Sequence, residues 1–308
     1  MKKSKIIYFF SAHNLNTTIL NKTALSPIVS GTMNWGVWDK NLSTSEMSQT
    51  MHLCVENGIT TFDHADIYGG YTTEAQFGKA FSESKISREK VQFISKCGIQ
   101  LTQGRDNKIK HYDYSKNYII WSVENSLKNL QTDFLDVLLL HRPSPLMVAD
   151  EIAEAVSKLK SEGKIIDFGV SNFTASQTEL IRQKIAINYN QIQFSATQHE
   201  AMLDGNLDYM QIHNIRPMSW NPLGTVFRED NEQTRRLKKL LVELVKKYEV
   251  GSDTILLAWI LKHPSQIIPI AGTVNTARIQ ALKKAVELDL DPLDWFAIWS
   301  ESMGDKVP

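Results

Sequence analysis

The stretch Thr60-Thr-Phe-Asp-His-Ala-Asp-Ile-Tyr-Gly-Gly70 joins a short β-prone run to a loop that ends in two glycines. It places an acid, Asp63, at the end of the run and a phenol, Tyr68, in the loop behind it. Two later β-prone runs have similar ends, since residues 91–95 lead to Lys96 and residues 135–140 lead to His141. The C-terminal ends of parallel strands meet on one face when the strands close into a barrel. These four ionisable side chains are therefore predicted to share one site.

Each of the four side chains also has an ordinary structural explanation, such as a cap for Asp63 or a solvated strand end for Lys96. The pattern as a whole favours a site. A lysine that follows Phe-Ile-Ser must be solvated or paired with a negative group, and Asp63 belongs to the preceding strand unit, where such a partner would lie.

The composition indicates a protein that acts on a small molecule. The chain has 308 residues, 42% of them hydrophobic, and 34 basic residues balance 34 acidic ones. A net charge of zero gives no indication of nucleic acid or of an anionic membrane surface as a partner. Cys54 and Cys97 have neither disulfide nor metal spacing, so we expect no metal site and a reducing, cytoplasmic setting. The apolar run 6–10 is too short for a secretory signal, and no run is long enough for a membrane span.

Alternation of β-prone runs and helical patterns predicts a TIM (β/α)8 barrel over residues 23–308, after an N-terminal extension at 1–22 that leads into a strand. Strands are expected at residues 28–33, 60–63, 91–95, 135–140, 165–170, 190–194, 217–220 and 267–270. Their helices are expected at 45–56 (capped by Ser45), 73–82, 115–130, 148–161, from 174 onwards, 207–213, 231–248 and 275–286. Two additional C-terminal helices are expected at 253–262 and 292–302, and residues 99–114 are expected to form a loop.

A doubly wound two-domain fold is the competing architecture. It would show a GxGxxG turn after the first strand, at the start of a helix. The first strand is instead followed by Gly-Thr-Met-Asn-Trp-Gly, residues 31–36, which favours the barrel.

Six motifs in the expected order make the chain similar to the aldo-keto reductases from about residue 25 to residue 286. Asp63-x-Ala65-x-x-Tyr68, Lys96 and His141 resemble the catalytic tetrad of that family. The segments Gly169-Val-Ser-Asn-Phe173 and Asn190-Gln191 resemble its nicotinamide-binding segments. Asp-His-Ala-Asp-Ile-Tyr-Gly-Gly-Tyr and His-Arg-Pro-x-Pro-Leu-Met further resemble a bacterial branch of general oxidoreductases.

The resemblance implies an NADPH-dependent oxidoreductase that reduces aldehyde or ketone carbonyls to alcohols. Tyr68 would give a proton to the carbonyl oxygen, His141 would orient the carbonyl, and Lys96, held by Asp63, would lower the pKa of Tyr68. Moving a phenol pKa from ~10 to ~7–8 requires roughly 3–4 kcal/mol. One ammonium about 4 Å away contributes about 4 kcal/mol at an effective dielectric constant of ~20, so a single lysine is expected to suffice.

The resemblance also implies the cofactor site. Ser171, Asn172 and Gln191 would bind the carboxamide, and Trp220 would stack on the nicotinamide ring. Gly31, Thr32 and Met33 would lie under the ribose, with Asp63 beside the nicotinamide. Asn221, Leu223 and Thr225 would follow the pyrophosphate. Trp35, Tyr71 and His141 are expected to form walls of the substrate pocket.

The segment Gly272-Thr-Val-Asn-Thr-Ala-Arg278 resembles the family's adenosine 2′-phosphate site, so NADP(H) is predicted in preference to NAD(H). Arg278 is the expected phosphate partner and Thr273 lies beside it. Gly272 stands where many members carry a lysine.

Two other functions remain possible from the residues. One is a nicotinamide-binding regulatory protein with little turnover, although no segment suggests an obligate protein partner. The other is a Schiff-base lyase that uses Lys96, which would require a lysine without an adjacent carboxylate.

Overall fold

The computed structural model describes residues 24–307. The predicted extension, residues 1–22, lies outside the described residues.

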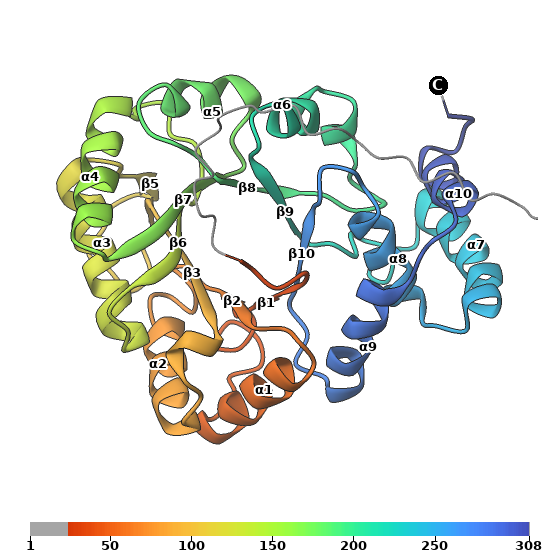
Figure 1. The fold of residues 1–308 in the computed structure, drawn as a ribbon, viewed down its shortest axis with the longest axis horizontal. Coiled ribbons are helices and arrows are strands. Elements are labelled where there is room, and N and C mark those ends of the chain that lie inside the picture. Colours follow the sequence, from red (N-terminus) through yellow and green to blue (C-terminus); the bar gives the residue numbers. More distant parts are fainter. Residues whose placement is uncertain (1–23, 308) are drawn as a thin grey trace, which may run out of the picture.

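Eight parallel strands form a closed barrel in the order β1-β10-β9-β8-β7-β6-β3-β2, which confirms the predicted fold (Figure 1). The barrel strands are β1 Val29–Gly31, β2 Thr61–Asp63, β3 Gln92–Cys97, β6 Leu135–Leu140, β7 Ile165–Ser171, β8 Tyr189–Gln193, β9 Arg216–Trp220 and β10 Ile268–Ala271. In this register Asp63 lies opposite both Gly31 and Ile94, and Lys96 lies opposite Leu139. Asp63 and Lys96 are thus on adjacent strands.

Ten α-helices accompany the strands within residues 24–307. They are α1 Thr44–Glu56, α2 Thr73–Ser84, α3 Lys116–Leu130, α4 Ala149–Ser161, α5 Ala175–Arg182, α6 Asn206–Ile212, α7 Glu232–Tyr248, α8 Ser252–Leu261, α9 Thr276–Glu287 and α10 Pro292–Met303. None of them is long and apolar enough to cross a membrane.

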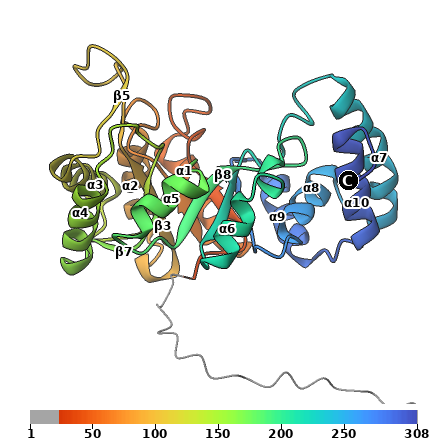
Figure 2. The same cartoon turned by 90° about the horizontal axis from the view of Figure 1, so that it is seen from above.

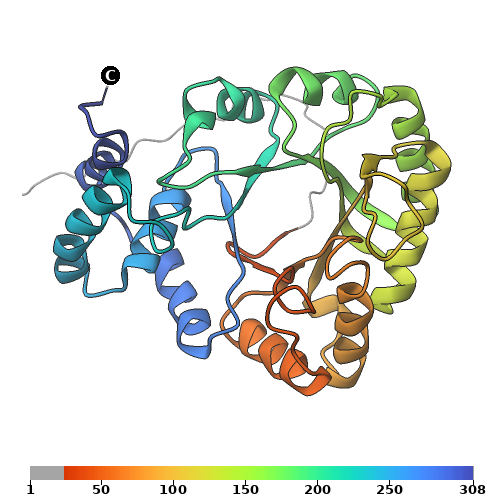
Figure 3. The same ribbon diagram turned by 180° about the vertical axis from the view of Figure 1, so that it is seen from behind.

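Helices α7 and α8 exchange the positions that the sequence predicted for them. Helix α8, expected to be an addition, packs against β10 and α9 as part of the ring around the barrel. Helix α7, expected to follow the seventh strand in the ring, packs mainly against α10 and lies further out (Figure 3). The physical reason is composition. Residues 254–260 of α8 are all buried, as in a helix that is apolar all round, whereas α7 has one apolar stripe.

The cap of the first helix lies two residues before the expected one. The cap is Ser43, whose hydroxyl accepts a hydrogen bond from the backbone N–H of Glu46. The Glu46 carboxylate in turn accepts from the Ser43 backbone N–H at 2.8 Å, which completes a capping box. Ser45 lacks this reciprocal partner, so its prediction as the cap is wrong.

Part of the loop expected at residues 99–114 is a hairpin. Strands β4 Ile99–Gln100 and β5 His111–Tyr112 pair antiparallel. The hairpin projects from one end of the barrel, as Figure 2 shows. It begins two residues after β3, so it rises beside Lys96.

An apolar cluster fills the barrel below Asp63 and Lys96. It contains Leu25, Val29, Ile94, Val137, Leu139, Tyr189, Met218, Ile268 and Ile270. The polar side chains of Asp63 and Lys96 come later along their strands and lie at the C-terminal end, where enzymes of this fold carry their active sites.

Candidate active site

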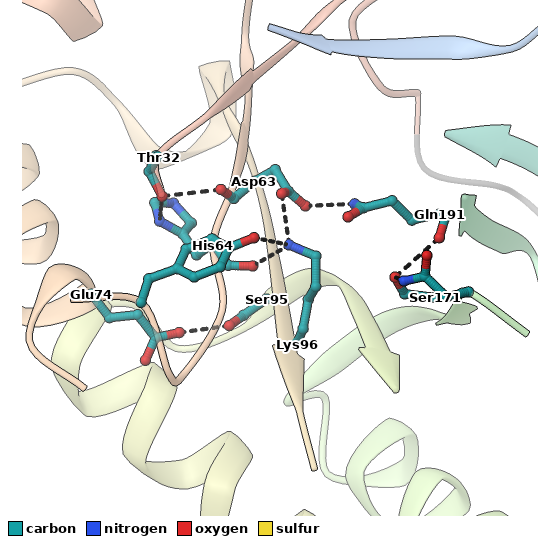
Figure 4. A network of polar contacts seen from close by, with 10 residues as sticks. Thr32, Asp63, His64, Glu74, Ser95, Lys96, Ser171 and Gln191 are labelled. Atoms are coloured by element: carbon teal, nitrogen blue, oxygen red, sulfur yellow. Dashed lines mark hydrogen bonds and ion pairs between the residues drawn. The ribbon is translucent and has the colours of Figure 1, made fainter. Parts of the chain in front are cut away.

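The ammonium group of Lys96 organises the site. Its Nζ donates to Asp63 Oδ2 at 2.6 Å, to the carbonyl oxygen of His64 at 2.7 Å and to the Tyr68 hydroxyl oxygen at 3.0 Å. An ammonium has three N–H donors, so all of them are used. Figure 4 shows the Lys96 ammonium of β3 hydrogen-bonded to the Asp63 carboxylate of β2.

Lys96 is held in its charged form. Burial alone would lower the pKa of Lys96, but Asp63 and Tyr68 outweigh it and raise the pKa above its usual value. The side chains of Lys96 and Asp63 are 0% and 3% exposed, so solvent does not compete for the ion pair between them.

The Tyr68 hydroxyl accepts a hydrogen bond from Lys96 and keeps its own proton free for another acceptor. Burial raises the pKa of Tyr68, while Lys96 opposes that rise. The expected net lowering of this pKa is therefore wrong. The prediction from sequence counted the attraction of the lysine but omitted the cost of charging a buried phenol and the repulsion from Asp63. Tyr68 is thus a protonated acid at neutral pH.

His141 lies beside Tyr68, with the two ring centroids 6.0 Å apart. Burial, together with the positive charges of Lys96 and Arg142, lowers the pKa of His141 well below its usual range. The imidazole is therefore neutral. Its Nδ1 is buried and has no hydrogen-bond partner among residues 24–307.

The second oxygen of the Asp63 carboxylate connects the tetrad to the β7–β8 side of the barrel. Asp63 Oδ1 accepts from Gln191 Nε2 at 3.0 Å. Ser171 Oγ donates to the Gln191 carbonyl oxygen at 3.0 Å, as Figure 4 shows. Asn172 Nδ2 donates to Ser171 Oγ at 2.8 Å, and Trp220 Nε1 donates to Asn172 Oδ1 at 2.8 Å. The four residues predicted for the nicotinamide are thus brought together.

These side chains have the chemistry that a primary carboxamide needs. Each amide has two N–H donors and an oxygen with two lone pairs, so Asn172 and Gln191 retain unused donors and acceptors after the bonds above. The residues present therefore fit a nicotinamide.

The segment 221–225, expected at the pyrophosphate, is clamped by an arginine that the sequence did not identify. Arg228 donates to Asn221 Oδ1 at 2.6 Å and to the Gly224 carbonyl oxygen at 2.7 Å. Gly224 has φ +56°, and a Cβ there would lie 2.0 Å from Thr197 Oγ1. Thr225 N–H also donates to that oxygen at 3.0 Å, while Leu223 packs against the core.

The segment predicted for the 2′-phosphate leads into the N-terminus of α9. Arg278 is exposed, and its guanidinium has no hydrogen bond or ion pair within the described chain. Gly272 and Thr273 precede this turn, and Thr273 Oγ1 accepts from the Asn275 N–H. A free guanidinium beside a helix N-terminus fits a phosphate.

Thr32 and Met33, which follow β1, differ from each other in burial. Thr32 is fully buried, and its hydroxyl bonds the Asp63 carbonyl oxygen and His64 Nδ1 (Figure 4). Met33 is 46% exposed, so contact between this segment and a ribose would be left to Met33 and to the backbone near Gly31.

Trp35 does not line a substrate pocket, and that prediction is wrong. Its side chain is fully buried and packs against Phe62 and Phe77, with ring centroids 6.1 and 5.8 Å away. Trp38 lies at the mouth of the site instead, 40% exposed and 6.1 Å from the Tyr68 ring. Two tryptophans three residues apart in an irregular loop carry no periodicity that would distinguish the buried one.

Tyr71 contacts the segment between β4 and β5, and its contact with a substrate stays a prediction. Its hydroxyl accepts from the Leu101 N–H at 2.8 Å, and the Arg105 guanidinium lies 3.8 Å from its ring centroid.

Tyr71 and Arg105 also line a cavity of about 160 Å³ between α2 and α3, which contains two buried carboxyl groups that the sequence did not single out. Burial, with repulsion from Glu74, raises the pKa of Asp66 to about 7. The Glu74 carboxylate accepts from Ser95 Oγ at 2.6 Å. The Glu74 carboxyl group lies on the other side of β3 from the Lys96 ammonium, because Ser95 and Lys96 point to opposite sides of the strand.

Fold and site together define a closed β/α barrel with a lysine-bonded tyrosine beside a neutral histidine. The family model described as "Aldo/keto reductase family" matches residues 27–300. The chain is 41% identical over 281 residues to the uncharacterized oxidoreductase YcsN of Bacillus subtilis (strain 168), which covers 89% of this chain and 94% of that protein. It is 35% identical over 297 residues to the 6-dehydroglucose reductase of Agrobacterium fabrum, covering 93% and 97%. An aldo/keto reductase structure from Klebsiella pneumoniae in complex with NADPH superposes with a TM-score of 0.76 at 22% identity, covering 89% of this chain and 90% of that one.

The chain belongs to the aldo/keto reductase family and is an oxidoreductase.

Proposed function

We propose that this enzyme reduces aldehyde or ketone carbonyls to alcohols, with NADPH as the reductant and Tyr68 as the proton donor. The observation that carries the proposal is the hydrogen-bonded set of Asp63, Lys96 and Tyr68 at the C-terminal end of the barrel. Its geometry gives the phenol a fixed position, and Lys96 stabilises the negative charge that develops on the phenol oxygen as the proton leaves.

The proton transfer follows from the bonds that Tyr68 already makes. Its oxygen receives an N–H from Lys96, so the hydroxyl proton is available to a substrate carbonyl oxygen within hydrogen-bonding distance. The raised pKa of Tyr68 keeps this proton in place at neutral pH. A neutral His141 contributes an N–H that can donate to the same carbonyl oxygen and orient it.

When bound, the dihydronicotinamide supplies a hydride to the carbonyl carbon. Ser171, Asn172 and Gln191 would hold its carboxamide and Trp220 would support its ring. The Met33 side chain and the backbone at Gly31 and Thr32 would flank the ribose, and Asn221, Leu223 and Thr225 would follow the pyrophosphate. Gly272, Thr273 and Arg278 would bind the 2′-phosphate. Several solved structures with this fold contain NADPH or NADP, which supports NADP(H) over NAD(H).

Lys96 is poorly suited to Schiff-base chemistry. Forming an imine requires a neutral amine, and the raised pKa of Lys96 keeps the amine protonated beside Asp63. Borohydride trapping with carbonyl substrates should therefore leave no covalent adduct on Lys96.

The decisive experiment is a turnover assay with a panel of aldehydes, ketones and quinones, followed through the absorbance of NADPH. The panel should contain sugar aldehydes, because one relative is named 6-dehydroglucose reductase. Turnover of at least one class supports the proposal. Tight NADPH binding without turnover of any class would instead favour a redox-sensing protein.

Replacing Arg278 by alanine is expected to weaken NADPH binding about ten- to hundredfold, which corresponds to ~1.5–3 kcal/mol for a hydrogen bond to a charged group. NADH binding should hardly change, because NADH lacks the 2′-phosphate. Gly272 offers no second cation, so raised salt should also weaken NADPH selectively. Fluorescence titration of both cofactors measures these effects.

Lys284→Ala is the matched control for Arg278, because it removes a positive charge from an exposed position of the same helix. It should leave both cofactor affinities unchanged. Equal losses for NADPH and NADH in Arg278→Ala would remove the main support for the NADP(H) assignment.

Chelators and reducing agents are expected to leave activity and thermal stability unaltered. Among residues 24–307 no group of three His, Cys, Asp or Glu side chains could hold a metal ion, and Cys54 and Cys97 are free and buried. We therefore propose a metal-independent enzyme of a reducing compartment such as the cytoplasm, acting without an obligate protein partner. A thermal midpoint that falls after EDTA treatment would contradict the first of these points.

A further inference from the structure

Arg142 has a free guanidinium beside the catalytic residues. Its side chain is half-buried and makes no hydrogen bond or ion pair with any side chain or backbone group of residues 24–307. Arg278, at the expected phosphate site, is exposed and is the other described arginine whose guanidinium has no such partner. The remaining arginines all donate from their side chains to described acceptors: Arg88, Arg105, Arg182, Arg216, Arg228, Arg235 and Arg236.

The position of Arg142 is fixed by its backbone. The Tyr114 hydroxyl donates to the Arg142 carbonyl oxygen at 2.5 Å and accepts from the Arg142 N–H at 3.1 Å. The guanidinium carbon lies 5.5 Å from the Trp220 ring centroid. Arg142 follows His141 directly, and its positive charge acts to lower the pKa of both Tyr68 and His141. The free cation therefore lies over Trp220 and close enough to Tyr68 and His141 to act on their charge.

A guanidinium on a half-buried residue, with only an indole ring as its contact, lacks the hydrogen-bond acceptor that usually accompanies a partly desolvated cation. Its planar set of N–H donors matches a carboxylate or a phosphate, which it can bind through two parallel hydrogen bonds. An anionic ligand is therefore the partner that this group lacks.

The substrate is a better source of that anion than the cofactor. The negative charges of NADPH are its pyrophosphate and 2′-phosphate, which we assign to residues 221–225 and 272–278. The nicotinamide end near Trp220 carries no negative charge. We propose that Arg142 binds an anionic group of the substrate, so that the preferred substrates are carbonyl compounds with a carboxylate or phosphate a short carbon chain from the carbonyl. This inference rests on the proposed carbonyl reduction at Tyr68.

The test compares pairs of substrates that differ in charge. One pair is 4-formylbenzoate and its methyl ester, and the other is glyceraldehyde 3-phosphate and glyceraldehyde. For each pair the quantity measured is the ratio of kcat/KM for the anionic compound to that for the neutral one, at saturating NADPH. Comparing the two pairs distinguishes a carboxylate from a phosphate.

The wild-type enzyme is expected to favour the anionic member of at least one pair. Arg142→Met should reduce that ratio about ten- to hundredfold, mainly through KM, because it removes a charge-assisted hydrogen bond. Arg142→Lys should retain part of the preference, since it keeps the charge but not the paired donors. Any effect on the acidity of Tyr68 acts on both members of a pair and cancels in the ratio.

Arg182→Met is the matched control, because Arg182 pairs with Glu179 at 2.8 Å on α5, and its ratios should equal those of the wild type. Equal losses for anionic and neutral substrates in Arg142→Met would overturn the inference, as would a loss confined to NADPH affinity. A wild-type enzyme that reduces both members equally well would overturn it too, while leaving carbonyl reduction intact. Failure to reduce any of the four compounds or any member of the larger panel would instead count against the proposed function.

Discussion

Replacing Tyr68 by phenylalanine will lower carbonyl reduction by about 10²–10⁴-fold, the usual contribution of a positioned general acid. The phenyl ring fills the same space but has no proton to give. NADPH affinity should stay within a few-fold of wild type, because the hydroxyl bonds Lys96 rather than a group assigned to the cofactor. Single-turnover kinetics and a cofactor titration on the same preparation measure the two quantities separately.

Tyr118→Phe is the matched control for Tyr68→Phe. It also removes a phenol hydroxyl that bonds a carboxylate, since Tyr118 Oη donates to Asp66 at 3.1 Å, but it lies outside the tetrad. Turnover of this variant should stay close to wild type. Turnover of Tyr68→Phe within tenfold of wild type would exclude Tyr68 as the proton donor.

Replacing Lys96 by methionine should have two large effects. Reduction should fall at least about a hundredfold, because the developing phenolate loses its cation. The protein should also lose about 3–5 kcal/mol of its free energy of unfolding, because Asp63 is left as a buried charge without its partner. The alkaline limb of the pH profile should move to higher pH. Lys96 favours the charged phenolate, so its removal raises the pKa of Tyr68 further.

A double variant separates the two effects of Lys96. Asp63→Asn combined with Lys96→Met contains neither buried charge, so it should recover much of the lost free energy of unfolding. It should remain inactive, because the phenol still lacks a cation. Denaturant titration and turnover measurements distinguish these outcomes. An alkaline limb that is unchanged in Lys96→Met would contradict the electrostatic role of Lys96.

The fold was predictable because its signals are local and repeated. Each β-prone run is followed by a helical pattern, and the strand Leu135–Leu140 was predicted with its observed bounds. The order of the helices around the barrel was less accessible. Both α7 and α8 are plausible helices from sequence, and only tertiary contacts decide that the all-apolar α8 lies against β10.

The tetrad was predictable because strand ends converge, whereas the details around it depend on irregular loops. No periodicity distinguishes buried Trp35 from partly exposed Trp38. Arg228 bonds Asn221 and Gly224 within one irregular loop, and Arg142 lies over the ring of Trp220, which is distant in sequence. No periodic pattern in the sequence specifies either contact. The direction of the Tyr68 pKa shift also depended on the depth of burial, which a count of nearby charges cannot supply.

The hydrogen bond between Asp63 and Gln191 affects how the barrel tolerates sequence change in its loops. In the strand order, β2 and β8 are four places apart on an eight-stranded ring, so the Asp63–Gln191 hydrogen bond crosses the barrel from one side to the opposite one. Gln191, Asp63 and Lys96 thus form a row of hydrogen-bonded polar side chains across the barrel, above the apolar cluster. Loops such as the β4–β5 hairpin are attached above this row and contribute no residue to it. They can therefore diverge or be exchanged without changing the hydrogen bonds that hold Lys96 between Asp63 and Tyr68.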